Sequence, residues 1–269
     1  MKREVGLEEY KDIILYVLLK VDAICRENGL KYSLFYGTLL GAVRHKGYIP
    51  WDDDIDIIMP IEDFDKLADI IREKDYGLNF ISPEDNEDTC FPFGKVCNTS
   101  TSIVETNLGE IKGYGAFIDI FPFYKVPVGK KWNNPAKYKL LRRLASYAKL
   151  KKYRKTGDFK KNMGRLLEFA ISRILDPRRL ALRIMRDGRK ANNLVDTNKL
   201  DFFYGELYES VRFPKEIFEN QQEVEFEGYS MFGTSNPHEN LSLWFGDYMK
   251  LPPEEQRIPH HNIVCYIEE

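Results

Sequence analysis

The chain has 269 residues, of which 43% are hydrophobic and 13% aromatic, so it is long and apolar enough for a large domain with a packed core. Its formal net charge of −2 argues against a nucleic-acid-binding protein, and we expect no nucleic-acid partner. The four cysteines stand far apart, without the spacing of a zinc site or of a disulfide framework, which indicates a reduced, cytoplasmic protein.

The chain begins with a charged segment and continues with a helix and a strand. Residues 1–10 lack the apolar core of a signal peptide, and we expect no segment that spans a membrane. Residues 7–28 carry apolar side chains at helical spacing and are followed by Gly29, which predicts a helix that ends there. Residues 32–36 are rich in aromatics and predict a strand, and residues 39–43 predict the opening of a second helix.

An alternation of acidic and apolar residues follows. Residues 52–59 read DDDIDIIM, which is strand periodicity with the acids on one face. Residues 62–74 have the apolar spacing of an amphipathic helix. Residues 93–97 and 115–121 predict two further strands, and the second of them places one acid, Asp119, among apolar neighbours.

The middle of the chain is strongly basic and mostly helical in pattern. Residues 130–190 contain 21 Lys and Arg but four acidic residues, whereas the remainder has 19 basic and 38 acidic residues. Such segregation indicates surfaces with different partners, and a basic amphipathic helix either lies on an anionic membrane or packs on the core with a solvated basic face. We therefore divide the chain into a catalytic core, 1–129, a basic helical insertion at the membrane or acceptor, 130–199, and a C-terminal part that completes the core, 200–269.

The acids on the two strands form a candidate metal site. Side chains alternate along a strand, so Asp54 and Asp56 point to the same side, and Asp119 can join them from a neighbouring strand. Asp52 lies on the same face and is a further candidate ligand. A buried acid on an apolar strand is costly unless it is paired or bound to a metal. Because Mg²⁺ prefers a few carboxylates together with phosphate oxygens, we expect Mg²⁺ or Mn²⁺ here.

The glycine step between the first strand and the second helix adds a candidate phosphate site. Backbone N–H groups of Gly37 and Thr38 and the threonine hydroxyl can hold phosphate at a helix N-terminus. A calcium loop in the acidic segment is excluded, because Ile57 and Asp63 stand where it needs glycine and glutamate. A solvated acidic face stays open as an alternative, although it does not account for the isoleucines between the acids or for Asp119.

These residues carry a family resemblance. Residues 36–56, YGTLLGAVRHKGYIPWDDDID, closely resemble the signature of the LicD family, which includes fukutin and fukutin-related protein. Thr38 stands where many members of the wider superfamily have Ser or Gly, and it keeps a hydroxyl. Weaker similarities follow in residues 93–96, 117–122, 226–228 and 245–253, and in Arg257, His260 and His261. The resemblance covers most of the chain except its basic middle.

The resemblance implies an α/β (α+β) fold, a nucleotidyltransferase-like mixed sheet with flanking helices, and transfer of a phospho-alcohol from a CDP donor. In bacterial members the donor is usually CDP-choline and the acceptor a sugar of teichoic acid or lipopolysaccharide. By matching position, Asp54 and Asp56 are implied to be metal ligands and Asp119 the third carboxylate, and Asp52 falls on the acidic motif. The candidates for binding substrate are Gly37, Thr38, Arg44, Lys95, Arg257, His260 and His261.

The expected reaction is attack of a sugar hydroxyl on the phosphorus that carries the alcohol, in line with the departing CMP. Asp119 is expected to bind metal or to accept the hydroxyl proton. A lipid-linked glycan acceptor would bring the protein to the inner face of the plasma membrane as a peripheral protein. Aromatic faces commonly hold quaternary ammonium groups, but 16 Tyr and 17 Phe do not single out a choline cage.

Three other functions compete with phosphocholine transfer. Another CDP-linked alcohol, such as ribitol, glycerol or ethanolamine, would use the same site. A true nucleotidyltransferase, which moves a nucleoside monophosphate from a triphosphate, would use the acids equally well, and only the family motif argues against it. A non-catalytic nucleotide-binding relative is the third, and the intact acids Asp54, Asp56 and Asp119 argue against it.

Overall fold

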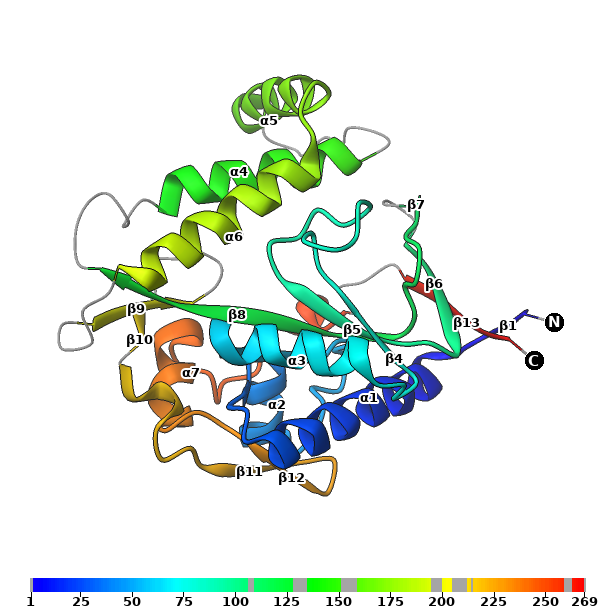
Figure 1. Cartoon of the computed structure of the whole chain (residues 1–269), viewed down its shortest axis with the longest axis vertical. Coiled ribbons are helices and arrows are strands. Elements are labelled where there is room, and N and C mark those ends of the chain that lie inside the picture. The colour runs from blue at the N-terminus through cyan, green and yellow to red at the C-terminus, as the bar shows by residue number, and fades with distance from the viewer. Residues whose placement is uncertain are drawn as a thin grey trace.

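The computed structural model of the chain describes residues 2–105, 109–127, 135–150, 159–194, 200–204, 212–213, 215–258 and 263–268. The helices are α1 (Leu7–Asn28), α2 (Tyr36–His45), α3 (Ile61–Glu73), α4 (Pro135–Lys149), α5 (Phe159–Ser172), α6 (Pro177–Asn193) and α7 (Pro237–Phe245). Two short 3₁₀ segments lie at Lys215–Phe218 and Glu254–Gln256. In Figure 1, α1 and α2 lie below the central strands and α4 to α6 lie above them.

The central sheet has seven strands and is mixed, which confirms the predicted α/β (α+β) class. Its strands are β2 (Ser33–Leu34), β3 (Asp56–Pro60), β4 (Leu78–Ile81), β5 (Gly94–Asn98), β8 (Phe117–Pro127), β9 (Leu200–Tyr204) and β10 (Arg212–Phe213). The long strand β8 is the axis of the sheet. It pairs in parallel with β3, whereas β5 and β9 pair with it antiparallel, near its start and its end.

A smaller sheet brings the two ends of the chain together. It has the order β1-β13-β6-β7, with β1 at Lys2–Glu4, β6 at Thr101–Glu105, β7 at Gly109–Glu110 and β13 at Ile263–Glu268. Both termini lie at this end of the molecule (Figure 1). A separate hairpin, β11 (Glu223–Phe226) and β12 (Tyr229–Phe232), lies beside α1 and α2.

Two predicted helices are confirmed nearly to the residue. Helix α1 spans Leu7–Asn28 and ends at Gly29, whose φ of 63° is the left-handed conformation that glycine adopts without steric cost. Helix α3 spans Ile61–Glu73 and buries its apolar stripe, which includes Phe64 and Leu67.

Two predicted strands begin or end elsewhere. The acidic strand begins at Asp56 and not at Asp52, because neither neighbour extends further back along it. The antiparallel neighbour β2 is short, and the bonds to the parallel neighbour β8 reach back to Ile55, whose carbonyl accepts from the Asp119 N–H of β8 at 2.8 Å. Helix α2 begins at Tyr36 and not at residue 39, which limits the predicted strand 32–36 to two residues. Asp52 and Asp54 therefore lie in an irregular segment, and strand alternation does not fix their directions.

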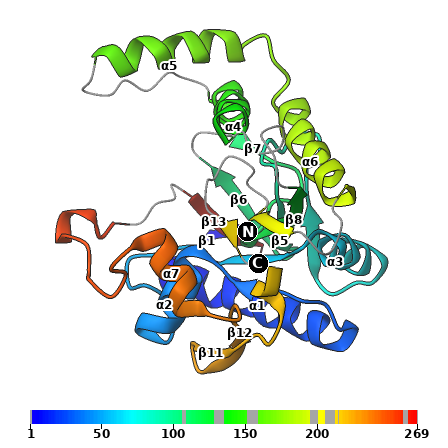
Figure 2. The same cartoon turned by 90° about the vertical axis from the view of Figure 1, so that its left-hand side faces the viewer.

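The basic segment forms three helices that are attached to the sheet through α6. Gly188 of α6 lies so close to Tyr124 of β8 that a Cβ there would fall 2.7 Å from the tyrosine ring. Arg189 binds Asp65 of α3 and Glu84, each at 2.8 Å. Helix α4 packs on α6, and α5 packs on α4 at the greatest remove from the sheet (Figures 1 and 2). The division into three parts at residues 129 and 199 stays a prediction.

Candidate active site

A row of charged side chains crosses three adjacent strands. In the parallel pairing of β3 with β8, Asp56 stands directly opposite Asp119, and in the antiparallel pairing of β5 with β8, Lys95 stands opposite Asp119 from the other side. Residues in register on neighbouring strands present their side chains to the same face, so Asp56, Asp119 and Lys95 form one line, the acid row. All three are buried.

Lys95 and Asp119 form a buried ion pair between the Lys95 Nζ and one carboxylate oxygen of Asp119. The side chains keep only 7% and 12% of their exposure. The ammonium also lies 3.6 Å from the centre of the Phe117 ring, which adds a cation–π contact. The lysine that the sequence placed among substrate-binding candidates is thus the direct partner of the third carboxylate.

Asp56 lies in an excess of negative charge. Burial raises the pKa of its carboxyl well above the usual range, and the charges of Asp54, Asp119 and Asp52 add to that rise. Asp52 and Asp54 are therefore close enough to act on Asp56, although they precede the strand. The acid row with these two neighbours brings four carboxylates together, and the Lys95 ammonium acts on Asp56 in the opposite direction by lowering its pKa.

The donor set of this cluster fits a hard divalent cation. Within the described part of the chain, no three acidic, histidine or cysteine side chains stand close enough together to hold an ion by themselves. Mg²⁺ does not need such a cage, because it usually takes one or two carboxylates and completes its shell with water and substrate phosphates. Carboxylate oxygens that lie close together suit that mode of binding.

The glycine step lies in the first turn of α2 and touches the acids from the side. The Thr38 hydroxyl accepts a hydrogen bond from the Asp56 N–H at 2.8 Å, so this threonine fixes the start of β3. A Cβ on Gly37 would fall 2.6 Å from a carboxylate oxygen of Asp52, so a larger residue here would require the Asp52 side chain to shift. Both residues thus lie beside the acids, and their binding of phosphate stays a prediction.

Arg44 lines a pocket where the first motif meets the C-terminal segment. Its guanidinium donates to the Tyr248 carbonyl at 2.7 Å and to the His45 Nε2 at 2.9 Å, and burial lowers the pKa of Arg44. The guanidinium of Arg257 lies 5.5 Å from the centre of the Trp51 ring. Trp51 directly precedes the acidic segment in the sequence. The pocket has a volume of about 400 Å³ and is lined by Leu40, Arg44, Ile49, Trp51, Phe245, Asp247, Tyr248, Lys250, Leu251, Pro252, Pro253 and Gln256.

The two predicted histidines, His260 and His261, lie outside the described residues. Of the other candidates, the structure brings Asp52, Asp54, Asp56, Asp119, Lys95, Gly37 and Thr38 to one place. Arg44 and Arg257 lie at the pocket beside Trp51.

An aromatic wall beside the acid row was not singled out from the sequence. Phe121 follows Asp119 by two residues on β8 and so points to the same face, where its ring lies 4.7 Å from Phe93 and 5.6 Å from Tyr36. Tyr36 stacks on Trp244 at 4.6 Å, and Phe91 stacks on Phe93 at 5.3 Å. Tyr36, Phe91 and Trp244 are half-buried, at the border of this group.

The backbone of the aromatic wall is strained at one residue. Tyr36 has a φ of 39°, a conformation that bulky residues rarely adopt and that is found mostly where function or tight packing imposes it. Phe121 and Phe93 could have been predicted from the sequence, because each lies two residues from Asp119 or Lys95 on the same strand or its edge. Trp244 comes from a distant helix, and no local pattern connects it with the acids.

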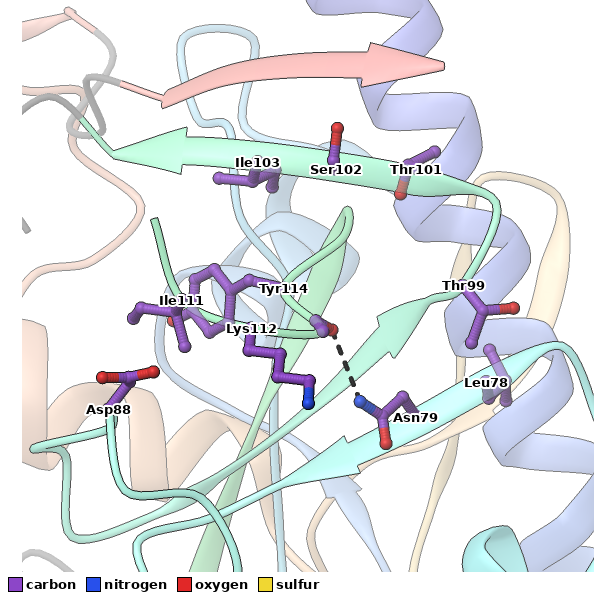
Figure 3. A pocket seen from close by; sticks show the side chains of 11 residues that line it. Leu78, Asn79, Asp88, Thr99, Thr101, Ser102, Ile103, Ile111, Lys112 and Tyr114 are labelled. Atoms are coloured by element: carbon purple, nitrogen blue, oxygen red, sulfur yellow. Dashed lines mark hydrogen bonds between the residues drawn. The ribbon is translucent and has the colours of Figure 1, made fainter. Parts of the chain in front are cut away.

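A second pocket lies beside Tyr114. Its volume is about 570 Å³, and it is lined by residues of β4, β6 and the loop before β8 (Figure 3). The Asn79 amide donates to the Gly113 carbonyl at 3.4 Å across this pocket. None of the predicted site residues lines it. Tyr114 adjoins both regions, since it lines the pocket and its ring centre is 5.7 Å from the Lys95 Nζ.

Comparison with known proteins identifies the class. A family model described as "LicD/FKTN/FKRP, nucleotidyltransferase domain" matches residues 29–154, a range that contains every member of the acid row. Together with the similarity over the full chain described next, this match identifies the protein as a phosphotransferase.

The chain is 32% identical to the lipopolysaccharide cholinephosphotransferase LicD of Haemophilus influenzae over 273 residues, which covers 98% of this chain and 99% of that protein. It belongs to the LicD family. Uncharacterized proteins of Rickettsia typhi and Rickettsia prowazekii are 48% and 47% identical over 58 and 64 residues. These shorter matches cover 21% and 23% of this chain, and 19% and 24% of those proteins.

None of the described helices has both the length and the apolar character that crossing a bilayer requires.

Proposed function

We propose that this enzyme transfers phosphocholine from CDP-choline to a sugar hydroxyl of a cell-surface glycan precursor, of the teichoic-acid or lipopolysaccharide kind, with the help of Mg²⁺ or Mn²⁺. The observation that carries the proposal is the register of Asp56 with Asp119 on adjacent parallel strands, next to Asp52 and Asp54. The name of the Haemophilus relative supports choline as the alcohol and lipopolysaccharide as one kind of acceptor.

The acids have two roles, which are to bind the metal ion and to accept a proton. Asp54 and Asp56 would hold the cation, with Asp52 close by, and the bound cation would neutralise the donor diphosphate and the CMP leaving group. Asp119 accepts the proton of the attacking hydroxyl while the new O–P bond forms and the bond from phosphorus to the CMP oxygen breaks. Lys95 holds the Asp119 carboxylate in place through their ion pair.

The donor nucleotide is assigned to the pocket between α2 and the C-terminal segment. Arg44 offers a guanidinium for a phosphate, and Trp51 offers an aromatic face for the cytosine ring. Trp51 directly precedes the acidic segment, so a nucleotide in this pocket has its diphosphate near Asp52. Arg257, which lies over the same ring, would close on it.

A panel of donors tests the proposed reaction. The purified protein is incubated with a glycan acceptor and with CDP-choline, CDP-ribitol, CDP-glycerol or CDP-ethanolamine, and CMP release is measured. We expect release with CDP-choline, loss of release in EDTA, and its return with added Mg²⁺ or Mn²⁺. Pyrophosphate release from nucleoside triphosphates would instead identify a nucleotidyltransferase, and binding of donors without turnover would identify a non-catalytic relative.

The aromatic wall is assigned to the trimethylammonium group of choline. Replacing Phe91 or Trp244 by Leu keeps an apolar side chain but removes a ring face, and one such contact contributes about 0.5–2 kcal/mol. We therefore expect the KM for CDP-choline to rise roughly 2–30-fold in each variant, with a smaller change for CDP-glycerol, which carries no cation. Steady-state kinetics with both donors measure the difference.

The matched control for these variants is Tyr229→Leu, which removes an exposed ring from strand β12, away from the acid row. Its KM for both donors should stay at the value of the unmodified protein. Equal losses for CDP-choline and CDP-glycerol in the Phe91 and Trp244 variants would remove the choline assignment and leave the transfer reaction itself untouched.

The proposed place of action is the inner face of the plasma membrane, where a lipid-linked glycan acceptor is available. The basic composition of the insertion supports this location, since cations near a cytoplasmic bilayer are attracted by anionic lipids.

A further inference from the structure

Helix α5 turns an unbroken apolar stripe toward the solvent. The side chains of the stripe recur every three or four residues, which places them on one face of α5 and of the turn that follows it. They are Met163, Leu166, Leu167, Ala170, Ile171 and Ile174. The large side chains among them are exposed by 63% (Met163), 51% (Leu166), 63% (Leu167), 42% (Ile171) and 86% (Ile174). A contiguous apolar surface of this kind is uncommon on a soluble domain and marks a surface that binds something.

The opposite face of α5 is fixed, so the direction of the stripe is determined. Glu168 accepts from Arg143 of α4 at 2.5 Å, and the Phe169 ring lies edge-on to Tyr147 of α4 at 6.5 Å. Arg173 donates to the Tyr147 carbonyl at 3.0 Å, and its guanidinium lies 4.5 Å from the centre of the Phe169 ring. The helix uses its polar and aromatic side to bind α4 and therefore presents the apolar stripe outward.

The position and the surroundings of the stripe decide which partner fits it. Helix α5 lies at the opposite end of the molecule from the hairpin of β11 and β12, beyond α4 and α6 (Figures 1 and 2). Exposed cations accompany it on all three helices, namely Lys139, Arg142, Arg143, Arg165, Arg173, Arg179, Arg183, Arg186 and Lys190. An apolar stripe accompanied by cations is complementary to an anionic bilayer, whose headgroups attract the cations and whose acyl chains take up the apolar side chains.

The geometry points to α5 as the membrane-docking element: we propose that it lies in the plane of an anionic bilayer surface with Met163, Leu166, Leu167, Ile171 and Ile174 directed toward the acyl chains. This inference rests on the membrane location in the proposed function and not on the transfer chemistry. Besides the general attraction between basic residues and anionic lipids, the protein would have a defined apolar contact with the bilayer on one helix.

Flotation with lipid vesicles tests the docking element in the full-length protein. One set of vesicles contains equal parts of phosphatidylglycerol and phosphatidylcholine, and the other contains phosphatidylcholine alone. We expect the protein to float with the anionic vesicles at low salt, and to keep part of that binding at high salt because the apolar contact is not screened. Binding to phosphatidylcholine alone should be about tenfold weaker.

Two double variants separate the apolar stripe from general charge. In L166E/L167E we expect anionic-vesicle binding to fall at least about tenfold. The control L7E/L194E changes two exposed leucines, at the start of α1 and directly after α6, at 42% and 63% exposure, and should float like the unmodified protein. Both variants should keep the far-UV circular dichroism of the unmodified protein and its CMP release with a water-soluble sugar acceptor.

Three results would overturn the proposal. The first is failure of the unmodified protein to float with anionic vesicles at low salt. The second is equal flotation of L166E/L167E and the control. The third is a dimer in light scattering that L166E/L167E dissociates, without any vesicle binding, which would make the stripe a contact between two copies of the chain. If the unmodified protein releases no CMP with a soluble acceptor, that result would instead count against the proposed reaction.

Discussion

Replacing Asp56 by Asn is expected to lower the rate of phosphocholine transfer by roughly 10²–10⁴-fold while the fold stays intact. Asparagine has the same shape, and the backbone contacts of residue 56 with Thr38 and Phe35 do not depend on the side chain. The change removes a buried charge that Asp54 and Asp119 repel, so the thermal stability of the ligand-free protein should stay the same or rise. The measurements are kcat with CDP-choline and the Tm without ligand.

The control for this variant is Asp69→Asn, on the exposed side of α3, where the side chain keeps 69% of its exposure. It should retain full activity. Addition of Mg²⁺ with CDP-choline should raise the Tm of the unmodified protein and of Asp69→Asn, but much less that of Asp56→Asn. Unreduced kcat in Asp56→Asn, together with the same dependence on metal, would contradict the assignment of this residue.

Replacing Lys95 by Met is expected to destabilise the protein by about 3–5 kcal/mol, because it leaves the Asp119 carboxylate buried without its partner. For a chain of this size that loss corresponds to a fall in Tm of about 6–20 °C. Methionine keeps an unbranched apolar side chain of similar length, although the cation–π contact of the ammonium with the Phe117 ring is lost as well. The fall in Tm therefore reports the unpaired charge more than lost packing.

The double variant K95M/D119N tests whether the two residues act as a pair. Removing both charges should restore most of the lost stability, so the effects of the two single changes should be far from additive. The double variant should nevertheless be inactive, because Asp119 is assigned the hydroxyl proton. Additive losses of Tm would show that the ion pair does not stabilise the fold, and a fully active double variant would remove Asp119 from the reaction.

Local periodicity was enough to predict the elements that carry the site. The helical spacing of α1 and α3 and the apolar runs of β5 and β8 are properties of short segments, and they lie close to the expected places. The convergence of Asp119 with Asp56 was predicted from two acids on apolar strands, because burying either alone is costly. The roles of these acids stay a proposal.

The contacts between distant segments could not be predicted from the sequence. The pairing of Lys95 with Asp119 depends on the register of two antiparallel strands, which local sequence does not encode. The start of β3 at Asp56, and not at Asp52, depends on the lengths of β2 and β8. The contact between Arg44 and Tyr248 joins residues 204 positions apart. The apolar stripe of α5 was visible as a pattern, but only the structure distinguishes an exposed stripe from a buried one.

The attachment of α6 to β8 has a mechanical consequence. Helix α6 has 17 residues and so a length of about 25 Å, and it rests on the same strand that carries Asp119. A short segment joins its first turn to the end of α5. With α5 docked on a bilayer as proposed, the three helices would set the distance between the lipid surface and the acids. The enzyme would then choose among the sugars of a glycan by their distance from the lipid.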